Sequence, residues 1–399
     1  MSYSERAGTP SSSPKAEYES YMERAIELAR RGRWHAAPNP CVGAVLVQNG
    51  HIVAEGWHKH YGGKHAEIEC LDDARQKGVD PRGCTMAVTL EPCAHYGKTP
   101  PCAKALIGAG IQRVIIGMPD PHLEASGGAQ LLRAAGIEVI SGIKDSECRL
   151  LTDDFLVWTC RHRPYVIVKM ASSLDGRTGP RDHGRWSISG TGSHAGLMEL
   201  RSRVAISGGL ILIGGNTFYT DDPKLTARGV NASRQPIAGI VVSALPEHPE
   251  AFHLTRERPQ DTIFFCPEEA SYGPKAEALK EMGVRIFPVP KTGGKNDLAE
   301  ILRICLDILK APYVLCEGGP SLAGSFLEKG LADLVLLYQA PMLFADSEAK
   351  PVFAGRETHA LPDAIHGRIL SARPSGSDLK ILFKPEYSSF GGHDVYRAD

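Results

Sequence analysis

The chain lacks the long apolar runs of a membrane protein. No run approaches the roughly 18 to 20 residues that cross a bilayer. The start of the chain, Met1 to Pro14, is polar and Ser-rich, without the apolar stretch of a signal peptide. We therefore expect a soluble, cytoplasmic protein with no membrane partner.

An excess of charge of one sign is also missing. The 45 Lys and Arg residues balance 46 Asp and Glu residues, for a formal net charge of -1. No positive field is available for a polyanion. The charge balance argues against a nucleic-acid partner and favours a small-molecule ligand.

The ten cysteines are scattered and follow no secretory signal. A reducing compartment favours thiols or metal ligands over disulfides. We expect most of these cysteines to be buried apolar residues, including Cys70, Cys148, Cys266 and Cys305.

The length of 399 residues, 42% of them hydrophobic, exceeds what one core accommodates, so two domains are expected. In the first half, a helix is predicted from Tyr18 to Arg31, and Asn49-Gly50 predicts a hairpin between two β-rich runs. Helices and strands then alternate, which predicts a three-layer α/β domain. The further predicted segments are helices at 66–74, 101–109 and 129–135 and strands at 85–90, 113–117 and 137–140.

A polar helical connector from Lys144 to about Arg161 ends at Arg163-Pro164 and predicts a domain boundary near residue 160. We expect a disordered tail at 1–17, a first domain at 18–160 and a second at 161–399. The second domain is predicted to be another α/β sheet, with strands at 165–170, 210–213, 237–242, 262–266, 313–316 and 335–339.

One constellation in the first half carries metal chemistry. His65 and Glu67 open a predicted helix, and Pro92-Cys93 is followed after eight residues by Cys102. One imidazole and two thiolates are the three protein ligands of a catalytic zinc, which keeps a fourth position for water. Zinc lowers the pKa of that water to roughly 7, and Glu67 is placed to take its proton and pass it to a leaving amine.

The expected site differs from the common deaminase pattern, in which H-x-E precedes P-C-x-x-C. Here eight residues separate the cysteines instead of two. The wider spacing narrows the choice of deaminase family and does not exclude a deaminase. A purely structural zinc site is the alternative, but three ligands leave an open position beside a carboxylate. A helix start near Cys93 would favour its thiolate.

The second half lacks the G-x-G-x-x-G fingerprint that follows a strand in dinucleotide-binding folds. Two other glycine turns follow predicted strands, at Glu317 to Pro320 and at Gly214 to Thr217. Glycines let the backbone approach a ligand, and free N–H groups at a helix start hold a phosphate. Together they suggest a dinucleotide cleft, although Gly-Gly-Pro-Ser is also an ordinary turn.

The first half resembles the deaminase part of the bifunctional riboflavin-biosynthesis deaminase-reductases. The resemblance is carried by the segments 38–43, 56–58, 62–67 and 89–102. It implies a cytidine-deaminase-like fold and deamination of a diamino-pyrimidinone ribosyl phosphate. It also implies substrate contacts from Asn39, His58, His95 and Lys98.

Two of these implied contacts have a physical rationale and an alternative. Lys98 offers a positive charge for a phosphate, and Asn39 offers both a donor and an acceptor to a heterocycle. Alternatively, Asn39 holds a turn between its two prolines and Lys98 is simply solvated.

The second half resembles the reductase part of the same family, through Thr217 and the segments 165–178, 221–223, 225–228 and 317–325. The resemblance implies a dihydrofolate-reductase-like α/β fold and NADPH reduction of the ribosyl group to ribityl. The segment 165–178 includes Asp175. The implied cofactor contacts are Ala171, Thr217, Asp221, Ser243, Gly319, Pro320, Ser321, Leu322, Ala323, Gly324 and Ser325. The implied substrate contacts are Leu225, Arg228, Glu317 and either Arg201 or Arg203. Arg228 suits a phosphate because its guanidinium is always charged and can bind in a bidentate way.

The sequence departs from the family in three places: extra residues at 187–209, a replaced glycine-rich segment at 341–346, and an altered pattern at 120–125. Two alternatives follow, an active deaminase with a degenerate reductase and a non-catalytic zinc- and nucleotide-binding regulatory protein. The neutral charge and the second domain argue against a tRNA- or nucleoside-editing deaminase. Self-association into a homo-oligomer is an expectation of the resemblance.

Overall fold

The structure is a computed structural model that describes residues 14–96, 100–122, 126–181, 187–228 and 234–387. It divides into two compact units, and the chain passes from the first to the second between Arg161 and His162. Among the described residues, no helix is long and apolar enough to cross a membrane.

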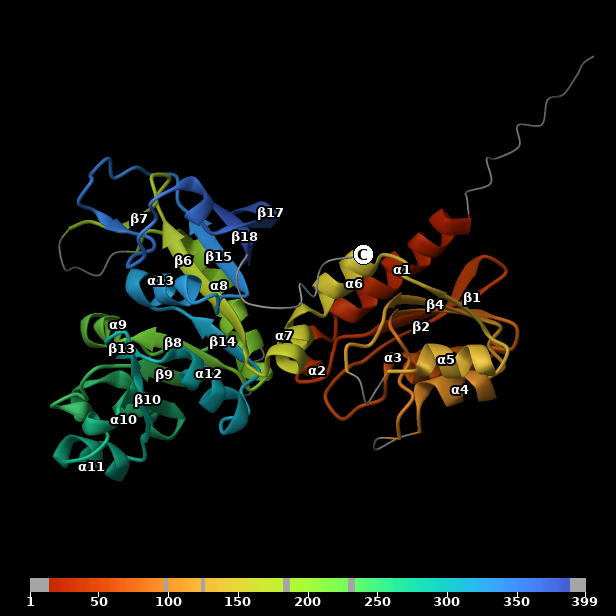
Figure 1. Cartoon of the computed structure of the whole chain (residues 1–399), viewed down its shortest axis with the longest axis horizontal. Helices are drawn as coiled ribbons and strands as arrows, with labels where there is room; N and C mark the ends of the chain where they lie inside the picture. Colours follow the sequence, from red (N-terminus) through yellow and green to blue (C-terminus); the bar gives the residue numbers. More distant parts are fainter. Residues whose placement is uncertain (1–13, 97–99, 123–125, 182–186, 229–233, 388–399) are drawn as a thin grey trace, which may run out of the picture. The chain divides into compact units, whose positions relative to one another are not determined.

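The first unit is a three-layer α/β domain (Figure 1). Its five strands have the order β2-β1-β3-β4-β5, in which β1 runs antiparallel to its neighbours and β3, β4 and β5 are parallel. Helices α1 and α6 cover one face, and α3, α4 and α5 cover the other. The elements are α1 (Pro14–Arg30), α2 (Arg33–Ala36), β1 (Gly43–Gln48), β2 (His51–Trp57), α3 (Ala66–Gln76), β3 (Thr85–Leu90), α4 (Cys102–Gly108), β4 (Arg113–Met118), α5 (Gly128–Ala134), β5 (Glu138–Ser141), α6 (Asp145–Leu151) and α7 (Asp153–Arg161).

Helix α1 begins earlier than the sequence predicted. Residues 14 to 17 were expected in a disordered tail, but Pro14 is the first helical residue and Glu17 lies in the first turn. Proline is favoured at the first helical position, and an acidic residue is favoured near a helix N-terminus. The first turn therefore belongs to the helix, and residues 1–13 lie outside the described part.

The β1–β2 hairpin forms where Asn49-Gly50 predicted it. Asn49 and Gly50 have φ values of 51° and 78°, and Gln48 pairs with His51 across the turn. Positive φ at both central residues is the geometry that Asn-Gly favours. The hairpin sets the antiparallel edge of the sheet.

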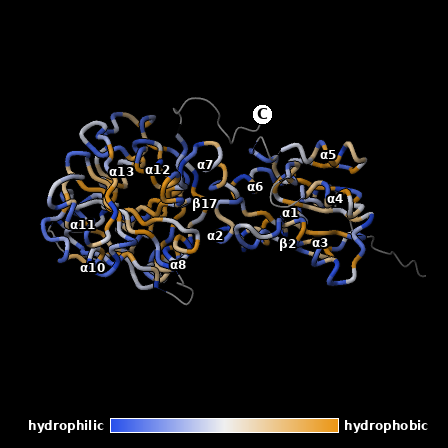
Figure 2. Tube along the Cα trace, turned by 90° about the horizontal axis from the view of Figure 1, so that it is seen from below, coloured by the Kyte–Doolittle hydropathy of each residue, from blue (hydrophilic) through white to orange (hydrophobic). Residues whose placement is uncertain are grey.

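Both units bury their apolar residues along the sheet strands, while the outer turns are hydrophilic (Figure 2). The cysteines expected to be apolar core residues, Cys70, Cys148, Cys266 and Cys305, are fully buried. No disulfide joins any of the described cysteines.

The second unit is built on a nine-stranded sheet with the order β11-β10-β9-β8-β14-β6-β15-β18-β17. The strands from β11 to β15 are parallel, and β18 and β17 add an antiparallel hairpin. The sheet strands are β6 (Tyr165–Ser172), β8 (Leu210–Gly214), β9 (Ile237–Val241), β10 (Thr262–Pro267), β11 (Arg285–Val289), β14 (Tyr313–Cys316), β15 (Leu334–Gln339), β17 (His366–Ser375) and β18 (Asp378–Glu386).

Helices cover both faces of this sheet. Helices α12 and α13 pack their apolar side chains on the face that carries Val166, Val168 and Met170. Helix α8 packs on β14, β8, β17 and β18. The helices are α8 (Thr191–Ile206), α9 (Gly215–Asp221), α10 (His253–Glu257), α11 (Pro274–Glu281), α12 (Leu298–Asp307) and α13 (Pro320–Glu328), and short strands β7 (Arg177–Gly179), β12 (Lys291–Thr292), β13 (Lys295–Asn296) and β16 (Lys350–Pro351) lie outside the main sheet.

Candidate active sites

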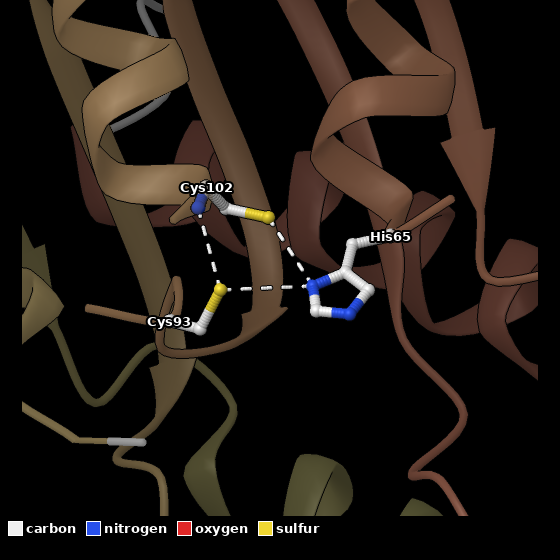
Figure 3. Close-up of side chains that lie close together, drawn as sticks. All are labelled: His65, Cys93 and Cys102. Atoms are coloured by element: carbon white, nitrogen blue, oxygen red, sulfur yellow. Dashed lines mark hydrogen bonds between the residues drawn. The ribbon is translucent and has the colours of Figure 1, made fainter. Parts of the chain in front are cut away.

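Three side chains from three different segments converge at the first candidate site (Figure 3). His65 precedes α3, Cys93 follows β3, and Cys102 is the first residue of α4. The Nδ1 atom of His65 lies 3.7 Å from the sulfur of Cys93 and 3.3 Å from the sulfur of Cys102. Within the described residues, this is the one group of at least three His, Cys, Asp or Glu side chains with metal-ligand spacing.

The distances fit a zinc ion. A nitrogen and a sulfur held tetrahedrally at ~2.1 Å and ~2.3 Å from zinc lie roughly 3.6 Å apart. The two observed nitrogen-to-sulfur distances fall on either side of that value. Zinc is also the metal that mixed imidazole and thiolate ligands favour. The residues present therefore fit a three-ligand zinc site with a fourth position for a water molecule.

The surroundings of the two cysteines favour a thiolate at Cys93. The interaction between the two side chains is the main cause that lowers the pKa of Cys93 and raises that of Cys102. The ring of His65 and the backbone N–H of Cys102 also hydrogen-bond to the Cys93 sulfur. This environment stabilises a thiolate, which is the form that binds metal.

Glu67 lies in the first turn of α3, two residues from His65, and only 3% of it is exposed. Burial raises the pKa of its carboxyl to about 7. A carboxyl whose pKa lies near neutrality gives up and takes back a proton with little free-energy cost. Glu67 therefore has the burial and the proton affinity of a general acid–base group beside the metal position.

Asn39 and His58, two of the predicted substrate contacts, lie together. The Nδ2 atom of Asn39 is 3.1 Å from Nε2 of His58, and Nδ1 of His58 donates to the carbonyl oxygen of Lys64 at 2.8 Å. Burial lowers the pKa of His58, so its ring is neutral at pH 7. The His58 and His65 rings are 5.7 Å apart, which puts the pair beside the metal ligands.

The structure does not bring His95 into this group. His95 is exposed, and among the described residues it makes no hydrogen bond to the three converging side chains. Lys98 lies outside the described residues. Both belong to the eight-residue segment between the cysteines.

Sequence reasoning missed Glu91, which fastens a loop beside Cys93. One carboxylate oxygen of Glu91 accepts hydrogen bonds from the backbone N–H groups of Gly127 and Ala129, at 3.1 and 2.9 Å. The other oxygen accepts from the backbone N–H of Asp120 at 3.3 Å. These bonds hold α5 and Asp120 close to the metal position.

The second candidate site lies at the carboxyl ends of the parallel strands β6, β8 and β14, the edge where ligands bind in α/β sheets. Helix α8 and the turn after β14 meet there through an ion pair. Nε and Nη2 of Arg201 each donate to one carboxylate oxygen of Glu317 at 2.7 Å. Both side chains are largely buried, at 13% and 8% exposure.

The Arg201–Glu317 ion pair distinguishes Arg201 from Arg203, the two arginines between which the sequence could not choose a substrate contact. Arg203 is exposed and pairs with Glu199 on the outer side of α8. Arg201 also donates from Nη1 to the carbonyl oxygen of Thr226, at 3.2 Å, on the segment that carries Leu225 and Arg228. The geometry therefore groups Arg201 with the other predicted substrate contacts.

Lys169 is a residue of this site that the sequence did not reveal. It lies on β6, and its charge interacts with those of Glu317 and Arg201. Burial lowers the pKa of Lys169, and its ammonium lies 5.7 Å from the centre of the Tyr338 ring. A lysine inside an otherwise apolar strand, Tyr165 to Met170, was the available signal.

The predicted cofactor residues lie at the ends of neighbouring strands. Thr217 is in α9 after β8, and Gly319 caps α13 after β14. A Cβ atom on Gly319 would be 3.7 Å from the hydroxyl of Thr217, so the two turns lie side by side. Ala171 is the residue before the last in β6, and Ser243 is exposed just beyond β9.

The start of α13 fits a phosphate. No side chain caps this nine-residue helix, so its first N–H groups are free for an anion. Pro320, Ser321 and Leu322 are partly or fully exposed, whereas Ala323 to Ser325 are buried. Gly324 packs directly against the backbone of Ala354. Any contact with a ligand is therefore made by the first turn.

Two protein families match the two units. Residues 15–118 match the cytidine and deoxycytidylate deaminase zinc-binding region. Residues 164–381, more than half of the chain, match the RibD C-terminal domain. Among curated relatives, the riboflavin biosynthesis protein RibD of Aquifex aeolicus is 34% identical over 91% of the chain and 97% of its own length. The RibD protein of Escherichia coli is 35% identical over 90% and 97%.

The chain belongs to the RibD family.

Solved RibD structures share the fold over both units. Acinetobacter baumannii RibD matches with a TM-score of 0.76, 30% identity and coverage of 94% of this chain and 100% of that chain. A Thermotoga maritima protein, described as a diaminohydroxyphosphoribosylaminopyrimidine deaminase and 5-amino-6-(5-phosphoribosylamino)uracil reductase, matches with a TM-score of 0.77, 33% identity and coverage of 93% and 99%. The predicted fold class is confirmed, with a cytidine-deaminase-like domain and a RibD reductase domain.

RibD membership also confirms the predicted pair of activities. RibD proteins combine a zinc-dependent deaminase with an NADPH-dependent reductase in riboflavin biosynthesis, and this chain carries both domains. The departures at 187–209 and 341–346 fall within the reductase domain and leave its family assignment intact.

Proposed function

We propose that residues 18–160 deaminate 2,5-diamino-6-ribosylamino-4(3H)-pyrimidinone 5′-phosphate and that residues 161–399 reduce the ribosyl group of the product to ribityl. The observation that carries the first step is the convergence of His65, Cys93 and Cys102, with Glu67 buried beside them. The Thermotoga maritima protein named for these two reactions supports the substrate.

In the deaminase, His65, Cys93 and Cys102 hold the metal. Zinc, when bound, acidifies a water to a pKa of roughly 7 and so supplies a nucleophile at neutral pH. Glu67 takes the proton of that water and delivers it to the amino group that leaves the pyrimidine. The carbon–nitrogen bond breaks, ammonia departs, and a carbonyl group takes its place.

Asn39 and His58 orient the heterocycle. Their hydrogen bond in the free protein aligns the Asn39 amide, which offers both a donor and an acceptor. Because His58 donates its Nδ1 proton to Lys64, its Nε2 atom is an acceptor toward Asn39. His95 and Lys98 complete the contacts, with Lys98 as the partner of the phosphate.

In the reductase, NADPH, when bound, supplies the hydride. Ala171, Thr217, Asp221, Ser243 and the first turn of α13 bind the cofactor, with its phosphate at the uncapped helix start. The hydride adds to the first carbon of the ribose, the bond from that carbon to the ring oxygen breaks, and the oxygen needs a proton.

Lys169 is the source of that proton, because its ammonium is the buried group at this edge that carries a proton, next to the charges of Glu317 and Arg201. Arg201 orients the carboxylate of Glu317 toward the substrate through its two hydrogen bonds. Leu225 contacts the sugar face, and Arg228 binds the phosphate. A cytoplasmic location and self-association stay predictions of the sequence.

The proposal is tested by incubating the zinc-loaded protein with the diamino-pyrimidinone phosphate, first without and then with NADPH. Ammonia release in the first phase and loss of absorbance at the NADPH band in the second are expected. Ammonia without NADPH oxidation would indicate a degenerate reductase. Bound zinc without either signal would indicate a non-catalytic protein.

A further inference from the structure

The segment 222–228, which joins α9 to the predicted phosphate contact Arg228, has an unusual backbone. Asp222 and Leu225 have φ values of 39° and 45°, in the left-handed region that favours glycine. A non-glycine residue keeps such a conformation when the surrounding structure imposes it. The contacts around this segment therefore indicate what fixes it.

Arg258, which directly follows α10, makes several of these contacts. Its Nη1 atom donates to the carbonyl oxygens of Lys224 and Leu225, both at 3.2 Å. Its Nη2 atom donates to the carbonyl oxygen of Pro236 at 2.5 Å. The side chain is 11% exposed. One planar guanidinium thus ties the left-handed residue Leu225 and its neighbour to the start of β9.

Arg258 and Arg201 hold consecutive carbonyl groups of the same segment. Arg258 binds the oxygens of Lys224 and Leu225, and Arg201 binds the next one, that of Thr226. Burial lowers the pKa of Arg258, and the positive charge of Arg201 acts in the same direction. Two guanidinium groups are therefore kept close together around this segment despite their repulsion.

The charge of Arg258 is poorly compensated. The carboxylate of Asp261 lies 3.5 Å away and is 51% exposed. The Nε atom of Arg258 is buried and makes no hydrogen bond in the described structure. A buried charge with only a long ion pair to an exposed acid is costly, which argues that the carbonyl contacts have a purpose beyond stability.

Surface contacts from α10 support the same segment. The backbone N–H of His253 donates to Asp222 Oδ1 at 2.7 Å, and Glu257 pairs with Lys224 at 3.1 Å. Lys224 and Glu257 are each about two-fifths exposed, at 42% and 41%. Exposed ion pairs of this kind contribute little to stability. Arg258 instead combines a largely buried side chain with two directional hydrogen bonds to this segment.

We propose that Arg258 is a positioning residue of the reductase: by holding the carbonyl groups of Lys224 and Leu225, it fixes the segment that presents Leu225 and Arg228 to the phosphorylated sugar. The inference rests on the proposed function, in which Leu225 and Arg228 bind the substrate. Arg258 has its Nη donors engaged by the backbone and touches no reacting atom. Its effect falls on substrate affinity, and the cofactor is bound by other segments.

The test compares Arg258→Gln and Arg258→Lys with the control Arg256→Gln in the full-length protein. Arg256 lies on α10 too, but it is 50% exposed and contacts Glu257 and His253 at the surface. For each variant, the reductase KM for the deaminated pyrimidine, kcat, and the Kd for NADPH are measured. Retained NADPH binding reports that the second unit, which contains Arg258, is folded, and the deaminase activity of the same preparation reports on the first unit.

Both Arg258 variants are expected to raise the KM about tenfold, since a small displacement of a binding segment has effects of this order. The Kd for NADPH, the deaminase activity and the Arg256→Gln control stay within twofold of the unchanged protein. Lysine is expected to fail like glutamine because it lacks the planar fork. Full recovery of KM by Arg258→Lys would show that charge alone matters and would overturn the proposal.

A double-mutant cycle with Arg228→Gln separates this inference from the proposed function. If Arg258 acts through Arg228, the tenfold effect of Arg258→Gln shrinks to less than threefold in the Arg228→Gln background. A raised KM in Arg228→Gln with an unchanged KM in Arg258→Gln overturns the positioning role alone. An unchanged KM in Arg228→Gln overturns the substrate role of the segment, and with it the positioning role.

Discussion

The backbone N–H of Cys102 donates a hydrogen bond of 3.3 Å to the sulfur of Cys93, at the first residue of α4. The eight residues between the two cysteines therefore close into a loop whose ends meet. This contact explains how a wide cysteine spacing yields the same ligand pair as the shorter spacing of other zinc deaminases. It also stabilises the thiolate that a metal requires.

Glu67→Gln removes the acid–base group and keeps its size. The deaminase rate is expected to fall by about 10² to 10⁴-fold, because a positioned proton carrier contributes that much. Zinc content and NADPH oxidation with the deaminated pyrimidine stay unchanged. Ammonia release and metal content are measured on one preparation, and ammonia release at the normal rate would remove Glu67 from the mechanism.

Cys93→Ser replaces one proposed ligand with a hydroxyl that binds zinc poorly. Less than one zinc per chain and loss of ammonia release are expected, with the reductase step unaffected. Cys160→Ser is the matched control, since Cys160 is exposed and lies on α7. Metal analysis after dialysis decides the outcome, and full zinc content in Cys93→Ser would contradict the ligand assignment.

Glu91→Gln tests the loop that Glu91 fastens beside Cys93. The amide keeps one oxygen and presents an N–H₂ group to backbone donors, so about 1 to 3 kcal/mol of stabilisation is lost. We expect a lower unfolding midpoint and a raised deaminase KM, with zinc retained. Glu138→Gln serves as the control because Glu138 is a 53% exposed partner of Arg113. Equal behaviour of the two variants would mean that the Glu91 contacts have no special role.

Lys169→Met tests the residue that the sequence did not reveal. NADPH oxidation is expected to be lost, while ammonia release continues. Since burial lowers the pKa of Lys169, the charged form is lost on the alkaline side at a pH below that of an ordinary lysine. The reductase rate should therefore fall as pH rises through that lowered value. Lys169→Arg should also lose most of the rate, because a guanidinium keeps its proton and cannot donate it. A Lys169→Arg variant with the normal rate would exclude Lys169 as the proton donor.

Asp333→Asn tests a buried ion pair that holds the start of β6 to the start of β15. Two nitrogen atoms of Arg163 donate to Asp333 at 2.6 and 2.7 Å, and the side chains are 10% and 3% exposed. Removing one partner of a buried pair costs about 3 to 5 kcal/mol. The reductase unfolding transition should move to lower temperature. An unchanged transition would show that the amide satisfies Arg163 equally well.

The parts of the fold that local sequence determines were predicted. Asn49-Gly50 placed the first hairpin, because few residue pairs adopt two positive φ values easily. Strands with apolar runs, such as Thr85 to Leu90, were also recognised. The β17–β18 hairpin was not, because β17 is largely exposed at the sheet edge and carries no alternating apolar pattern.

The candidate zinc site was predictable because each of its residue types is rare and the motif is local around each ligand. The reductase site was less so. Arg201 and Glu317 are 116 residues apart, and their pairing depends on how α8 packs against the end of β14. Arg258 lies in a polar stretch that resembles any exposed helix end. Only its largely buried side chain and its hydrogen bonds to Lys224 and Leu225 distinguish it from a surface arginine.

The central claim, that His65, Cys93 and Cys102 share one zinc with an open fourth position, is tested most directly by diffraction at the zinc absorption edge from crystals of the zinc-loaded protein. The account predicts one anomalous peak per chain, within ~2.0 to 2.3 Å of Nδ1 of His65 and of both sulfurs, with a water molecule as the fourth ligand facing Glu67. No peak at this position, or a fourth ligand from the protein, would contradict it.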